Sequence, residues 1–214
     1  MILQTESVIS VSKGGNMGNL NETPSANRLH IGIYGKTNSG KSSLINAVTK
    51  QEVSIVADVA GTTTDPVYKP MEIHPLGPCV IIDTAGFDDD SELGERRVEK
   101  THLAAEKTDI AVVVLDIAEV IAAKKAGVPF KKAFKDEAEW SLLFAKKHTP
   151  VVFALNKIDE ILLSAEAQEK SSGKLDNAAI EAAKCWVYEE NSAVMGKNAD
   201  NSFEVVAVSA LKGK

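Results

Sequence analysis

Residues 29–45 read LHIGIYGKTNSGKSSLI. The apolar, β-branched run Leu29–Tyr34 predicts a buried strand. The next residues, Gly35–Ser42, fit the pattern G-x-x-x-x-G-K-[ST], and the residues after them predict a helix. Strand, glycine-rich loop and helix in this order are typical of a loop that wraps phosphates with backbone N–H groups, beside the positive end of the helix dipole. The stretch therefore predicts an α/β fold with a P-loop.

This loop supplies most of the expected phosphate contacts. Lys41 is expected to reach the β- and γ-phosphates of a nucleoside triphosphate, which makes it a candidate catalytic residue. The hydroxyl of Ser42 is expected to ligate Mg²⁺. The phosphate-binding candidates of the loop are Asn38, Ser39, Gly40, Lys41, Ser42 and Ser43.

A second motif, Asp83-Thr84-Ala85-Gly86, follows the apolar run Val80–Ile82. A carboxylate at the end of a buried strand near a P-loop suits a Mg²⁺ contact, direct or through water, so Asp83 is a metal candidate. The N–H of Gly86 can turn toward a γ-phosphate, which makes Gly86 a candidate catalytic residue. The motif alone also fits a plain turn, but downstream of a P-loop it favours a nucleotide site.

Two later motifs predict selection of guanine. In Asn156-Lys157-Ile158-Asp159, the carboxylate of Asp159 would accept hydrogen bonds from N1–H and the exocyclic amine of guanine, a donor pair that adenine lacks. The backbone of Ser209-Ala210-Leu211 is expected to contact the guanine O6. The expected base-binding residues are Asn156, Lys157, Asp159, Ser209, Ala210 and Leu211.

Between the first two motifs lies Asp58-Val-Ala-Gly-Thr-Thr-Thr-Asp65. A threonine here would complete the Mg²⁺ shell when a γ-phosphate is present, so the segment is predicted to be a switch. Thr63 is the candidate for this Mg²⁺ contact and a candidate catalytic residue, and both Thr62 and Thr63 are expected to contact GTP. A polar turn is the alternative.

The rest of the chain predicts alternating strands and helices. Ile180, Ala183 and Val187 share one helix face by their spacing. A second predicted helix face consists of Phe134, Ala138, Leu142 and Ala145, and the stretches 117–132 and 191–201 are expected to be irregular loops. The predicted strands are Leu29–Tyr34, Val67–Ile73, Val80–Asp83, Ile110–Asp116, Val151–Asn156 and Phe203–Ser209.

Motif order and alternation together predict a translation-factor-class GTPase domain of the P-loop NTPase type. We expect a six-stranded, mostly parallel sheet with helices on both faces. Residues 28–214 are expected to form this domain and residues 1–27 a flexible N-terminal arm. Few residues follow Ala210, so we expect the final helix of the domain to be missing. The apolar strip that this helix would bury, beside the first and last strands, is then expected to be covered by another segment or a second copy of the chain.

Composition limits the partners. The chain has 214 residues and a net charge of -6, so no nucleic acid is expected to bind through a basic face. Its two cysteines form no metal-binding motif, so we expect no iron–sulfur cluster on this fragment. The longest apolar run, Ile110–Leu115, is too short to span a bilayer, and we expect a cytoplasmic protein, organellar only in a eukaryote.

The motifs resemble those of a known group. Asn38 in the P-loop and Gly61-Thr62-Thr63 match the potassium-activated GTPases of the TrmE/MnmE and Era group. The longer stretches Val59–Lys69 (VAGTTTDPVYK) and Met71–Pro78 (MEIHPLGP), with the later Glu92–Gly94 and Arg97–Lys100, resemble HydF, the GTPase scaffold of FeFe-hydrogenase maturation.

The resemblance implies a GTP-hydrolysing switch that gates delivery of a di-iron cofactor precursor. It implies GTP or GDP, Mg²⁺ and K⁺ as ligands, with hydrogenase and other maturation proteins as partners and a second copy of the chain as a further candidate. HydF proteins carry a dimerisation domain and a cluster-binding domain after the GTPase domain, so the resemblance implies that this chain is the first part of such a protein. By the same resemblance, the K⁺ candidates are Asn38, Ala57, Val59 and Thr62, and the Mg²⁺ candidates are Ser42, Thr63 and Asp83.

Two functional alternatives stay open. One is a GTPase of tRNA modification or ribosome assembly, and the other is a scaffold in which GTP only shapes a partner surface. Phe87 follows Gly86, and an apolar side chain cannot orient water, so hydrolysis is expected to be slow. Glu92 and Glu95 are the candidates for the catalytic Glu of the TrmE group, against a solvated helix face as the alternative.

Overall fold

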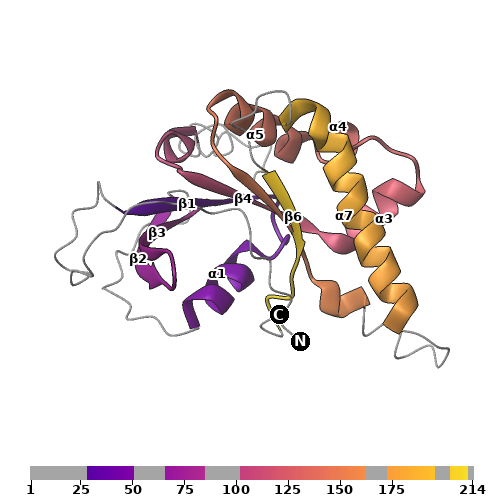
Figure 1. The fold of residues 1–214 in the computed structure, drawn as a ribbon, viewed down its shortest axis with the longest axis horizontal. Helices are drawn as coiled ribbons and strands as arrows, with labels where there is room; N and C mark the ends of the chain where they lie inside the picture. The colour runs from indigo at the N-terminus through magenta and orange to yellow at the C-terminus, as the bar shows by residue number, and fades with distance from the viewer. Residues whose placement is uncertain (1–27, 51–65, 85–101, 162–172, 196–202, 212–214) are drawn as a thin grey trace.

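The computed structural model describes residues 28–50, 66–84, 102–161, 173–195 and 203–211. Within them the chain forms both strands and helices (Figure 1). The strands are β1 (Leu29–Tyr34), β2 (Val67–Ile73), β3 (Gly77–Asp83), β4 (Ile110–Asp116), β5 (Val151–Asn156) and β6 (Phe203–Ala207). The helices include α1 (Lys41–Lys50), α3 (Ile117–Lys125), α4 (Phe130–Ala133), α5 (Lys135–Lys146) and α7 (Gly173–Met195), and residues 102–106 and 158–161 are helical as well.

The six strands form one sheet in the order β2-β3-β1-β4-β5-β6. Only β2 runs antiparallel, pairing with β3 from Val67 opposite Asp83 to Ile73 opposite Gly77. The other pairings are parallel, and β1 lies between β3 and β4. The predicted six-stranded, mostly parallel sheet is therefore confirmed.

Helices cover both faces of this sheet (Figure 1). On one face α3, α4, α5 and α7 enclose the larger core, in which Tyr34 stacks on Trp140 with ring centroids 5.3 Å apart. On the other face α1 covers a smaller core around Ile33, Ile45 and Ile81. The apolar side chains Leu29, Val112, Val206 and Val208 on this second face are only partly buried.

The spacing of apolar residues predicted one helix face well and another poorly. Ile180, Ala183 and Val187 of α7 are all buried, as expected. Leu142 of α5, however, is 38% exposed. The buried side of α5 follows Glu137, Trp140 and Phe144 instead, because the two aromatic rings pack against Tyr34 and turn Leu142 outward.

Two expected loops are wrong in part. Residues 117–132 contain helix α3, which begins where Asp116 Oδ1 accepts a hydrogen bond from the N–H of Ala118 at 2.8 Å, and α4 begins at Phe130. The cap and the buried Ile117 and Val120 favour the helix. The stretch 191–201 begins helical as well, since α7 extends to Met195. Strand bounds differ slightly, because β3 begins at Gly77 and β6 ends at Ala207.

The carboxyl ends of the parallel strands meet at one edge of the sheet, where ligands of open α/β folds bind. Gly35 follows β1, Asp83 ends β3, Asp116 ends β4 and Asn156 ends β5. The topology thus brings residues that are distant in sequence to one edge. In the described part of the chain, no helix is long and apolar enough to cross a membrane.

Candidate nucleotide-binding site

The P-loop connects β1 to α1 through a backbone that needs left-handed conformations. Gly40 has a φ of 93° and Asn38 a φ of 63°. Glycine adopts this region freely, and asparagine tolerates it better than most residues. Asn38 is exposed at the tip of the loop. Two of the expected phosphate-binding residues therefore fit the backbone that the loop requires.

Lys41 begins α1 and is held by the start of its own loop. Its Nζ donates to the carbonyl oxygens of Gly35 at 2.8 Å and of Lys36 at 2.7 Å. The side chain is only 7% exposed. The two carbonyl oxygens compensate the buried ammonium and direct it, which suits a group that meets phosphate oxygens.

Asn156 ties the P-loop to the segment after β6. Its Nδ2 donates to the carbonyl oxygen of Ser39 at 3.1 Å, and its Oδ1 accepts from the N–H of Ala210 at 3.2 Å. Asn156 is 1% exposed, so both ends of the amide have partners in a buried setting. This side chain fixes the position of the expected base-binding segments relative to the expected phosphate loop.

Asp159 lies in a short helical segment, residues 158–161, directly after β5. Its Oδ1 accepts a hydrogen bond from the hydroxyl of Ser209 at 2.6 Å, and the residue is only 5% exposed. A pocket of about 80 Å³ opens beside it. The pocket is lined by Gly40, Ser43, Asn156, Lys157, Asp159, Glu160, Ala210 and Leu211. The structure thus brings the P-loop, the Asn156–Asp159 motif and the Ser209–Leu211 motif to one pocket.

Lys157 forms one wall of this pocket in a fixed orientation. Its Nζ donates to Asp116 Oδ2 at 2.6 Å, while Asp116 Oδ1 caps helix α3. The hydrogen bond with Asp116 raises the pKa of Lys157, so the ammonium stays charged. Lys157 has a left-handed backbone, with a φ of 67°, and lines the pocket.

The expected Mg²⁺ ligands described in the structure are Ser42, at the start of α1, and Asp83, at the end of β3. A hydroxyl and a carboxylate are the hard oxygen donors that Mg²⁺ prefers. Burial raises the pKa of Asp83, and the charges of Lys69 and Lys41 offset part of this rise. The two lysines offset only part of the cost of burying the Asp83 carboxylate, and a bound cation would offset more of it. Ser42 and Asp83 therefore suit Mg²⁺.

Asp83→Asn is expected to stabilise the nucleotide-free protein at neutral pH while abolishing the Mg²⁺ dependence of nucleotide binding. The folded-state pKa of Asp83 lies above the unfolded value, so stability is lost as the pH rises through the folded pKa. The amide does not titrate and escapes this loss. Urea unfolding between pH 3.5 and 8 measures the effect, with the exposed Glu106→Gln as control. Equal stability of wild type and Asp83→Asn across this range would contradict the account.

The remaining predicted site residues lie outside the described part of the chain. These are Ala57, Val59, Thr62, Thr63, Gly86, Glu92 and Glu95. The switch, most of the expected K⁺ ligands and the candidates for water positioning therefore stay predictions. The N-terminal arm, residues 1–27, also lies outside the described residues. Within the described residues, no group of three or more His, Cys, Asp or Glu gathers as a metal site.

Sequence reasoning missed two acidic residues at the site. Asp116 stands at the end of the apolar run Ile110–Leu115, the same signal that identified Asp83, and could have been found by it. Glu137 gave no such signal. It sits on an amphipathic helix, and only the fold shows that its carboxylate reaches the backbone of Lys36.

Comparison with known proteins agrees with this geometry. The family model described as "50S ribosome-binding GTPase" matches residues 30–157, more than half of the chain. The chain is similar to GTPase Der of Mycoplasmopsis pulmonis, with 46% identity over 80 residues, which are 37% of this chain and 18% of that protein. It is also similar to the tRNA modification GTPase MnmE of Laribacter hongkongensis, with 34% identity over 132 residues, 61% of this chain and 26% of that protein. The chain thus spans only a minor part of these relatives.

Solved structures share the fold. Era of Aquifex aeolicus, bound to GDP and AlF4-, superposes with a TM-score of 0.53 at 24% identity, covering 86% of this chain and 52% of Era. A probable GTP-binding protein, engB, gives a TM-score of 0.53 at 21% identity, covering 85% of this chain and 89% of that one. Because the family model matches residues 30–157, more than half of the chain, the chain belongs to the family described as 50S ribosome-binding GTPase and is a GTPase domain.

Proposed function

We propose that this domain is a slow, potassium-stimulated molecular switch that selects guanine through Asp159. One observation carries the proposal. Ser209 fixes the Asp159 carboxylate by a buried 2.6 Å hydrogen bond, and Asp159 lines the same pocket as Gly40 of the P-loop. A fixed carboxylate at that place can accept both guanine donors without first losing freedom, which favours affinity as well as selectivity.

The proposed hydrolysis rests mainly on positioning. Lys41, directed by two carbonyl oxygens, meets the β- and γ-phosphates and stabilises the charge that develops as the γ-phosphoryl group leaves. Backbone N–H groups at the start of α1 add to this stabilisation. Mg²⁺, when bound near Ser42 and Asp83, neutralises phosphate charge. Phe87 follows Gly86 in the sequence and cannot orient water, which is why the intrinsic rate is expected to be low.

Potassium is expected to accelerate hydrolysis by about tenfold or more over sodium at equal ionic strength, a fraction of what an arginine finger supplies. In this proposal, Asn38 and backbone carbonyls of residues 57–62 hold K⁺ against the phosphates, and the exposed, left-handed Asn38 at the loop tip supports it. Single-turnover phosphate release in KCl and in NaCl measures the effect. Asn38→Ala should lose it, and the exposed Asn46→Ala on α1 should keep it. Equal rates in the two salts would refute the proposal.

We propose two candidates for the process that the switch serves. The printed names of the relatives, above all the tRNA modification GTPase MnmE at 34% identity over 132 residues, support RNA modification or ribosome assembly. The stretches Val59–Lys69 and Met71–Pro78, together with the net charge of -6, support the second candidate, a scaffold that delivers a di-iron cofactor precursor to FeFe-hydrogenase.

One set of assays separates these candidates. Single-turnover GTP hydrolysis is measured with tRNA, with 30S and 50S ribosomal subunits, and with purified FeFe-hydrogenase and its maturation proteins. Stimulation by an RNA-containing partner supports the first candidate, and stimulation by a maturation protein supports the second. If one of these proteins binds only the GTP-loaded domain without changing the rate, GTP acts as a shape signal in a scaffold. No binding to any of them overturns both candidates.

A further inference from the structure

Helix α5 carries a carboxyl group in an unexpected place. Glu137 is only 1% exposed and belongs to the buried side of the helix, between Phe134 and Trp140. Burying a carboxylate is costly unless hydrogen bonds and charges compensate it. Burial raises the pKa of Glu137, and backbone hydrogen bonds and the charge of Lys36 offset part of this rise. A residue that costs stability at this position calls for a reason other than packing.

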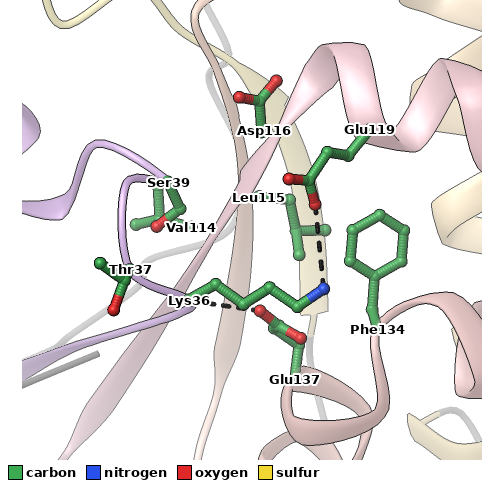
Figure 2. A pocket seen from close by; sticks show the side chains of 9 residues that line it. All are labelled: Lys36, Thr37, Ser39, Val114, Leu115, Asp116, Glu119, Phe134 and Glu137. Atoms are coloured by element: carbon green, nitrogen blue, oxygen red, sulfur yellow. Dashed lines mark hydrogen bonds and ion pairs between the residues drawn. The ribbon is translucent and has the colours of Figure 1, made fainter. Parts of the chain in front are cut away.

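The carboxylate of Glu137 contacts the P-loop (Figure 2). Its Oε1 accepts a hydrogen bond from the backbone N–H of Lys36 at 3.2 Å. The carbonyl oxygen of the same residue, Lys36, accepts from Lys41 Nζ at 2.7 Å. Glu137 therefore binds the N–H of Lys36, and the carbonyl group of the same residue binds the phosphate-binding Lys41.

The side chain of Lys36 reinforces this attachment. Its Nζ donates to the carbonyl oxygen of Ala133 at 3.3 Å and lies 5.1 Å from the ring centroid of Phe134. The same ammonium is 3.8 Å from the carboxylate of Glu119 on α3 (Figure 2). Backbone and side chain of Lys36 are thus both fixed to the helices that flank the loop.

A small cavity lies between Glu137 and the P-loop, with Ser39 in its lining. Ser39 and Glu137 both line this cavity. Their buried atoms Ser39 Oγ and Glu137 Oε2 have no hydrogen-bond partner among the described protein groups. The cavity offers about 10 Å³ to the centres of water molecules, which is close to the space that one water needs. One water could accept from the Ser39 hydroxyl and donate to the carboxylate, so that both orphaned atoms are satisfied.

We infer that Glu137 is a positioning residue for Lys41: by holding the N–H of Lys36, it keeps the two carbonyl oxygens in place that direct the lysine toward the β-phosphate. This inference rests on the proposed role of Lys41 in phosphate binding. An apolar residue would fill the same volume without the cost of burying a carboxyl group. The acceptor oxygen is therefore the property that matters, and the charge is not required.

The test measures how much affinity the β-phosphate adds, as the ratio of the dissociation constants of GMP and GDP. Both are obtained by competition against a fluorescent GDP analogue in Mg²⁺ buffer. Glu137→Met, which is close in shape but lacks the acceptor, is expected to lower this ratio by about tenfold, the value of one positioned hydrogen bond. Glu137→Gln keeps an acceptor and should retain the wild-type ratio. Glu139→Met, at an exposed position of the same helix, is the matched control.

The outcomes separate positioning from packing. A purely structural role lowers the melting temperature of Glu137→Met but leaves the ratio of the folded protein unchanged, and that result overturns the inference. A reduced ratio in Glu137→Gln overturns it as well. If Glu137→Met does not fold, Glu137→Leu replaces it with the same expectation. A wild-type protein that binds GMP as tightly as GDP refutes the proposed role of Lys41 itself, which distinguishes that failure from the failure of Glu137.

Discussion

Asp159→Asn is expected to weaken GTP binding by about a hundredfold or more and to allow xanthosine triphosphate to bind instead. The wild-type carboxylate accepts two hydrogen bonds from guanine, and each charge-assisted bond contributes roughly 1.5–3 kcal/mol. Asparagine offers one acceptor and one donor, which mismatches the guanine amine but matches the C2 carbonyl of xanthine. Equilibrium competition with both nucleotides on wild type and variant measures the exchange.

Ser209 provides the control for this exchange. Its hydroxyl donates to Asp159 at 2.6 Å, so Ser209→Ala removes the fixing bond but leaves the carboxylate. We expect Ser209→Ala to weaken GTP binding by less than Asp159→Asn and to leave the preference for guanine over xanthine intact. If Asp159→Asn keeps wild-type affinity for GTP and does not bind xanthosine triphosphate, Asp159 does not contact the base.

Gly40→Ala is expected to disrupt the site as a whole, with a loss of nucleotide affinity of about a hundredfold or a failure to fold. A Cβ atom at Gly40 would lie 2.1 Å from Asn156 Nδ2, and the φ of 93° already disfavours any side chain. Asn156 would have to leave its bonds to Ser39 and Ala210, and each buried group left unpaired costs about 1–3 kcal/mol. Chemical unfolding and GDP titration measure both losses.

Gly127→Ala is the matched control for Gly40→Ala. Gly127 also has a positive φ, of 64°, but an added Cβ would meet no atom within 4 Å. It therefore carries the conformational strain without the collision. We expect Gly127→Ala to cost about 1 kcal/mol of stability and to leave GDP binding unchanged. If the two variants behave alike, backbone strain alone explains the effect and the collision with Asn156 has no importance.

The sequence predicted the sheet and much of the site because both depend on local signals. Short β-branched runs predicted the strands β1, β4 and β5 to the residue. Polar motifs directly after those strands indicated the site, because parallel strands place their carboxyl ends at one edge. The segment Ser209–Leu211 was predicted to belong to the site for the same reason, because it follows strand β6.

The rest depends on contacts between distant parts of the chain. Leu142 fits the helical spacing of its neighbours, but the ring of Trp140 packs on Tyr34 and determines which side of α5 is buried. The contact between Glu137 and Lys36 joins residues 101 positions apart, and no local pattern marks it. Helix α3 lies in a stretch that we expected to be an irregular loop, and its N-cap, Asp116, is also the last residue of strand β4.

Competition between GTP and ATP for the purified domain tests the central claim most directly. The displacement of a fluorescent GDP analogue is titrated with each nucleotide in Mg²⁺ and KCl. Two charge-assisted bonds between Asp159 and guanine predict that ATP binds at least about a hundredfold more weakly than GTP. Equal displacement by ATP and GTP would contradict the assignment of the pocket around Asn156, Asp159 and Ser209 as a guanine site.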